Sequence, residues 1–104
     1  MTEPTVVEYE MGYGAGEFGN VLRGPFSGEN SGYRCEEKSR HHWALKQPGK
    51  DFDLTIEVAE KPVRKLGLFK LPVLGVKFTF TNTEKSLREK FFHRFHQYFH
   101  KGGG

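Results

Sequence analysis

Two stretches of strict two-residue alternation constrain the fold of this chain more than any other feature of its sequence. They are DFDLTIEVAE at residues 51–60 and LGVKFTFT at residues 74–81. Side chains alternate between the two faces of a strand, so each stretch predicts a strand with one buried and one wet face. The predicted buried side chains are Phe52, Leu54, Ile56, Val58, Leu74, Val76, Phe78 and Phe80. Such one-sided strands are typical of an antiparallel sheet.

Other segments predict further strands of the same sheet. Residues 5–11 alternate with β-branched and aromatic residues, and residues 41–47 place Trp43 and Leu45 on one face. Residues 33–39 predict a polar strand that suits an edge. Residues 18–26 also predict a strand, which a glycine-rich turn joins to the first one.

The chain ends in a segment with helical periodicity. We expect a helix over about residues 82–101, because Thr81 and Glu84 have the spacing of a capping box. At 100° per residue, one stripe gathers Leu87, Phe91, Phe92, Phe95, Tyr98 and Phe99. Gly102 is expected to end the helix, with a frayed glycine tail behind it. The whole chain, 1–104, is thus predicted to form one α+β domain. Its five- to six-stranded, mostly antiparallel meander would be packed on one face by the long C-terminal amphipathic aromatic helix.

Composition limits the class of protein. Cys35 is the only cysteine, so no intramolecular disulfide can form. The N-terminal residues lack the basic and apolar regions of a signal peptide, and no apolar run approaches the ~20 residues of a membrane span. We therefore expect a soluble, cytoplasmic protein.

Charge is distributed unevenly along the chain. Residues 1–60 hold six Lys or Arg against eleven Asp or Glu, whereas residues 61–104 hold ten against two. Either the two halves interleave their charges on folding, or the basic half binds a polyanion or an acidic partner.

Residues 61–72 (KPVRKLGLFKLP) mix basic and apolar side chains most closely. As an exposed loop, this segment would suit an anionic membrane surface, a nucleic acid backbone or a protein partner. As a further strand, it would bury Leu66, Leu68 and Leu71 in the core. The candidate residues for binding a polyanion or a partner are Lys61, Arg64, Lys65 and Lys70.

Residues 14–21 (GAGEFGNV) match two phosphate-binding fingerprints by letter. Gly14, Gly16 and Gly19 have the G-x-G-x-x-G spacing of dinucleotide-binding folds, but Gly24-Pro25 is expected to leave no room for the helix which that motif needs. The string also resembles the glycine-rich loop of protein kinases, which forms a hairpin, yet the metal-binding and catalytic carboxylate motifs of kinases do not follow. We therefore expect a flexible strand connection here and predict no nucleotide-binding residue.

Histidines and the cysteine are the remaining candidates. His93, His96 and His100 share one face of the expected helix, where they could hold Zn²⁺ or Ni²⁺, although a solvated polar face is the favoured explanation of them. No other cofactor is expected. A nucleophilic pair of Cys35 with His41 or His42 lacks an evident third group, so no catalytic residue is predicted. The sequence thus indicates a small binding or interaction domain rather than an enzyme. The alternatives are polyanion binding through the basic half and a small apolar ligand held between helix and sheet.

Overall fold

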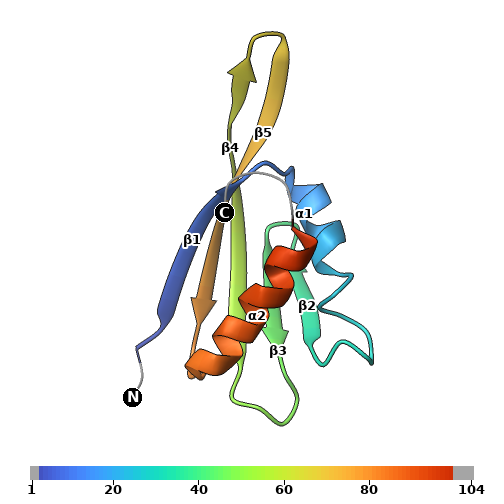
Figure 1. The fold of residues 1–104 in the computed structure, drawn as a ribbon, viewed down its shortest axis with the longest axis vertical. Coiled ribbons are helices and arrows are strands. Elements are labelled where there is room, and N and C mark those ends of the chain that lie inside the picture. The colour runs from blue at the N-terminus through green and yellow to red at the C-terminus, as the bar shows by residue number, and fades with distance from the viewer. Residues whose placement is uncertain (1–2, 100–104) are drawn as a thin grey trace.

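The computed structural model describes residues 3–99 (Figure 1). The elements follow one another as β1 (Thr5–Met11), α1 (Ala15–Leu22), β2 (Arg34–Ser39), β3 (His42–Lys46), β4 (Asp53–Leu66), β5 (Phe69–Phe80) and α2 (Lys85–Tyr98). The predicted glycine tail lies outside the described residues.

The five strands form one antiparallel sheet in the order β1-β5-β4-β3-β2. Strands β2 to β5 are a meander, and β1 pairs with β5 from Thr5 opposite Phe80 to Met11 opposite Leu74. Every side chain that the alternation of residues 51–60 and 74–81 assigned to the interior is at most 7% exposed. The α+β fold with an antiparallel meander and a C-terminal helix is therefore confirmed.

Aromatic rings fill the space between the sheet and the helices. Phe91 and Phe95 of α2 are fully buried against Phe78 of β5, with ring centroids 6.0 and 5.1 Å apart. Helix α1 packs on the same face, where Phe18 contacts Trp43 of β3 at 5.5 Å. Buried aromatic side chains contribute large apolar areas, which compensates for the few aliphatic residues of this chain. Both helices cover one sheet face, and the other face stays open to solvent (Figure 1).

Helix α1 corrects the prediction of a strand over residues 18–26. The chain turns helical directly after Gly14 and ends this helix at Leu22, ahead of Gly24 and Pro25. Ala15, Phe18 and Leu22 are buried, at the i, i+3, i+7 spacing of a helix face. Burial of that face outweighs the low helix propensity of the glycines.

Helix α2 is shorter than the predicted range of 82–101. Its N-cap is Glu84, not Thr81, because Asn82 adopts a left-handed conformation (φ +49°) and breaks the helix upstream. Thr83 ties this turn to β4, where its hydroxyl accepts a hydrogen bond from the backbone N–H of Asp53 at 3.0 Å. The helix ends at Tyr98, and Phe99 is already extended.

Strands β4 and β5 extend far beyond the rest of the sheet. Strand β3 pairs with β4 only as far as Glu57, and β1 pairs with β5 only as far as Leu74. Beyond these points, β4 and β5 pair with each other alone and form a projecting hairpin (Figure 1). We call residues 61–72 the arm.

Candidate binding surface

The arm is exposed along its whole length although it is rich in apolar residues. Every residue from Ala59 to Pro72 is exposed to solvent. The exposed fractions of the large apolar side chains are 52% for Val63, 55% for Leu66, 101% for Leu68, 73% for Phe69 and 43% for Leu71. These five side chains make up most of the exposed large apolar residues of the described chain. A cluster of this kind marks an interaction surface more often than a random feature of a folded domain. The expectation that Leu66, Leu68 and Leu71 could lie in the core is wrong.

Near its tip, the arm carries apolar side chains on one face and two lysines on the other, and the apolar face also includes Arg64, opposite Leu71. Residues opposite each other in an antiparallel pair lie on the same face. Leu66 pairs with Phe69, and Lys65 pairs with Lys70 on the opposite face. Gly67, in the left-handed region at φ +61°, begins the two-residue turn that fixes this register. The sequence already contained the signal for this hairpin, since glycine begins many two-residue turns.

The four predicted cations of the arm divide into two pairs. Lys61 donates a hydrogen bond to the Glu10 carboxylate of β1 at 3.2 Å, and Arg64 lies 4.0 Å from the same carboxylate. Lys65 and Lys70 lie further out, and no ion pair is recorded for either within residues 3–99. The segment from Lys61 to Val73 contains no acidic residue. Glu10, which the sequence reasoning missed, therefore leaves the positive charge concentrated toward the tip.

Charges on the open face of the sheet interleave, in contrast to the arm. Lys77 of β5 stands in register between Glu8 of β1 and Glu57 of β4. Beside this row, the small residues Gly75 and Ala59 line an open hollow of about 540 Å³. The Lys61 side chain lies over Gly75 and reaches the Glu10 carboxylate. The uneven charge of the two chain halves is thus offset over the body of the sheet, and it persists at the outer part of the arm.

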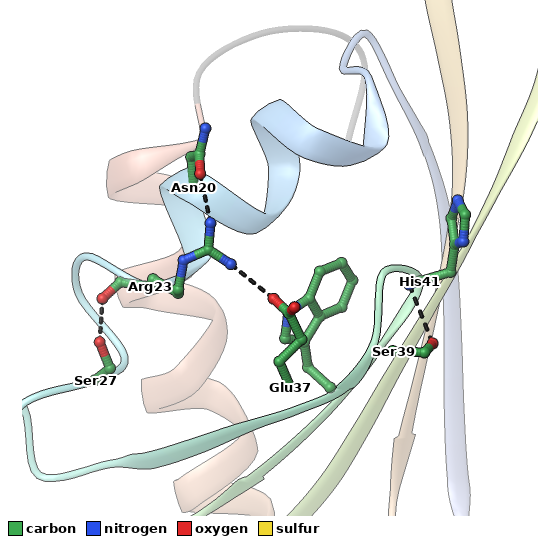
Figure 2. Close-up of polar contacts among 7 residues, drawn as sticks. Asn20, Arg23, Ser27, Glu37, Ser39 and His41 are labelled. Carbon is green, nitrogen blue, oxygen red and sulfur yellow. Dashed lines mark hydrogen bonds and ion pairs between the residues drawn. The ribbon is translucent and has the colours of Figure 1, made fainter.

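The glycine string GAGEFGNV forms most of helix α1, which lies beside the β2 edge of the sheet (Figure 2). Arg23 follows α1 and donates a hydrogen bond to the Glu37 carboxylate at 2.7 Å. Trp43 donates its indole N–H to the same carboxylate at 3.3 Å. A Cβ atom on Gly19 would lie 3.0 Å from the Trp43 ring, so glycine here allows the helix to approach the sheet closely.

This geometry changes the reason for setting the dinucleotide fingerprint aside. A helix does begin directly after Gly14, so the expectation that no helix fits is wrong, and so is the expected flexible strand connection. The dinucleotide motif, however, belongs to a parallel βαβ unit, in which two parallel strands flank the helix. Here α1 joins β1 to β2 at opposite edges of an antiparallel sheet. Of the three glycines, Gly19 serves the close packing of α1 on the sheet, whereas nothing lies within 4 Å of the Cβ position of Gly14 or Gly16.

Only part of the predicted histidine face can be described. His93 and His96 lie on α2 and are exposed, and His96 stacks on Phe92 with ring centroids 5.9 Å apart. His100 lies outside the described residues, and the helix that was to align it ends at Tyr98. Within residues 3–99, no three histidine, cysteine or acidic side chains gather as metal ligands would.

Cys35 is not set up as a nucleophile. It lies on β2 opposite Leu45 and packs against the core, whereas the alternation of β3 places His42 on the other face from Leu45. Figure 2 shows His41 well apart from the Arg23–Glu37 pair. Burial raises the pKa of the Cys35 thiol, Arg23 opposes that effect and Glu37 adds to it. A raised pKa lowers the thiolate fraction at neutral pH and with it the reactivity of the thiol.

Comparisons of the chain with protein-family models, curated proteins and solved structures give no match. Among residues 3–99, neither helix is long and apolar enough to cross a membrane. A cytoplasmic location stays a prediction from the sequence. The function is therefore argued from the arm itself.

Proposed function

We propose that this chain is a non-catalytic binding module that binds a polyanionic surface through its arm. The observation that carries the proposal is the Lys65–Lys70 pair, two cross-strand lysines on an exposed hairpin that form no ion pair with an acidic side chain of residues 3–99. Two like charges directly opposite each other in a strand pair are destabilising. An anionic ligand between or above them would relieve that repulsion, which gives the pair a physical reason to bind.

The body of the domain supports this role as a rigid base. Buried aromatic rings hold the sheet and α2 together. The arm continues β4 and β5, which are two inner strands of the sheet. Six residues of β4, from Lys61 to Leu66, extend the arm by about 20 Å at ~3.3 Å per residue. Lys65 and Lys70 are thereby held toward the tip, beyond the Lys61 and Arg64 side chains that pair with Glu10 of the body.

The alternative of a small apolar ligand between helix and sheet finds less support. Phe80 and Phe91 pack there with ring centroids 5.9 Å apart, and both are at most 2% exposed. Rings packed this closely leave the interface to the protein's own side chains.

The test is retention on immobilised heparin, a soluble polyanion, with elution by a salt gradient. We expect Lys65→Glu/Lys70→Glu to elute at clearly lower salt than the wild type, because charge contacts to a polyanion are salt-dependent. Lys50→Glu/Lys90→Glu is the matched control, since both lysines are exposed on the body and give the same change in net charge. If the two variants lose the same amount of heparin retention, net charge explains the effect, and the arm is rejected as the binding element.

A further inference from the structure

The tip of the arm presents apolar side chains that binding to a polyanion does not use. Leu66, Leu68 and Phe69 are exposed by 55, 101 and 73% and surround the turn. A nucleic acid backbone offers charged phosphate oxygens, and leucine side chains gain nothing from contact with them. The tip and the basic face together match a ligand with an anionic surface and an apolar interior.

Resting on the proposed function, we infer that the polyanion is an anionic lipid bilayer and that the arm inserts its tip into it. Interfacial protein segments bury their apolar side chains about 5–10 Å deep, at the boundary of headgroups and acyl chains. The tip stands at the end of a projecting hairpin, so it reaches this depth while the body stays in water (Figure 1).

The positions of the cations fit the same geometry. Lys65 precedes Leu66 and Lys70 follows Phe69, so one lysine borders the tip on each strand. Lysine has a long aliphatic stem, which lies along apolar surface while the ammonium group stays among polar groups. Both ammonium groups can therefore meet anionic headgroups when the tip lies among the acyl chains.

A second copy of the chain is the less favoured occupant of the apolar face. Arms that pack on each other bring Lys65 and Lys70 of one copy against a segment without an acidic partner, because residues 61–73 contain no acidic residue. An anionic bilayer offers partners to the lysines and to the apolar side chains alike, and every inserted side chain adds its own transfer free energy.

The experiment is co-sedimentation of the full chain with two kinds of lipid vesicle. One contains phosphatidylcholine alone, and the other contains phosphatidylcholine with 30% phosphatidylserine as a chosen anionic composition. Leu68→Ser/Phe69→Ser removes the apolar tip, and Val6→Ser is the control, because Val6 is 49% exposed on β1, away from the arm. All variants are also run on heparin, and their circular dichroism checks that the body is folded.

We expect the wild type to bind the anionic vesicles and to bind the neutral ones weakly. Loss of two lysines near the surface lowers the affinity roughly 30-fold, so Lys65→Glu/Lys70→Glu should lose at least that much. The tip variant should lose roughly tenfold or more on vesicles, since a buried leucine or phenylalanine contributes that much. Its heparin retention should not change, and the Val6→Ser control should match the wild type in both assays.

Three results would overturn the inference. Retention on heparin without binding to anionic vesicles would leave the proposed function standing and exclude the bilayer. If Leu68→Ser/Phe69→Ser binds anionic vesicles as tightly as the wild type does, insertion of the tip is excluded. A concentration-dependent dimer in sedimentation velocity that the tip variant abolishes would assign the apolar face to self-association. If the folded wild type binds neither heparin nor anionic vesicles, the proposed function itself is rejected.

A tryptophan at the tip measures insertion directly. In Leu68→Trp, the new indole should be quenched by lipids brominated on their acyl chains. Trp43 is 1% exposed in the core and provides the constant background. Quenching with anionic vesicles supports insertion, and unquenched emission from bound protein contradicts it.

Discussion

The inner and outer halves of the β4–β5 hairpin both carry apolar cross-strand pairs, and the surroundings of these pairs are opposite. In the inner half, Ile56 and Phe78 face each other under α2 and are fully buried. In the outer half, Leu66 and Phe69 face each other in the same way and remain mostly exposed. Phe69 and Phe78 are an odd number of residues apart on β5, so Leu66 and Phe69 lie on the sheet face opposite α2. Strands β1 and β3 also stop short of the arm, so nothing in the described chain covers this pair. Apolar alternation therefore shows that a strand has an apolar face and leaves open what covers it.

The comparison also separates stability from binding. Residues under α2 contribute to the free energy of unfolding through buried area, at about 25 cal/mol per Å². Residues of the arm bury little and can vary with small effects on the fold. We expect substitutions in the two halves to affect different measurements, and the predictions below follow from that contrast.

The largest expected contrast is between two phenylalanines. Phe91 is fully buried among the rings of Phe52, Phe80 and Phe95, so Phe91→Ala should destabilise the protein by about 3–5 kcal/mol. Phe69→Ala should change stability by no more than about 0.5 kcal/mol, because the side chain is 73% exposed. Urea denaturation of both variants measures the difference. Similar losses of stability in the two variants would mean that the Phe69 side chain packs against other residues and is not exposed as described.

A smaller contrast concerns two glycines of α1. Gly19→Val should destabilise by about 2 kcal/mol, since its side chain would press on the Trp43 ring. Gly16→Ala should stabilise by up to about 1 kcal/mol, because nothing lies within 4 Å of its Cβ position and alanine is the better helix former. Thermal melts of the pair check both signs. A stable Gly19→Val variant would show that α1 does not pack as described.

The smallest expected effect is on the charge of the arm base. Glu10→Gln removes the carboxylate that pairs with Lys61 and Arg64. Stability should fall by less than about 1 kcal/mol, because such exposed ion pairs contribute little. Elution from heparin should move to higher salt, since two cations are released for binding. An unchanged or earlier elution would show that these cations take no part.

The sequence allowed much of the fold to be predicted and less of the site. Alternation located β1 and the inner parts of β4 and β5, because each has one face turned toward the core. Helix α1 was missed because four glycines hid the spacing of Ala15, Phe18 and Leu22, although that spacing was present. The start of α2 was misplaced because Thr83 hydrogen-bonds to Asp53, 30 residues away, a contact that no local pattern contains.

The candidate cations were predicted as one group, and their division into two pairs was not. Glu10 neutralises Lys61 and Arg64 only because β1 ends beside the base of the arm. That position depends on the order of strands in the sheet. Local spacing gives the residue types of a surface, and topology decides which charges stay unpaired.

The most direct test of the account removes the arm. Lys61 and Val73 are cross-strand partners, so a two-residue Asn-Gly turn can replace residues 62–72 between them. We predict a folded protein whose melting temperature stays within a few degrees of the wild type and whose heparin retention falls to that of Lys65→Glu/Lys70→Glu. An unfolded product, or a folded one that still binds heparin like the wild type, would contradict the claim that the arm is for binding and the body for stability.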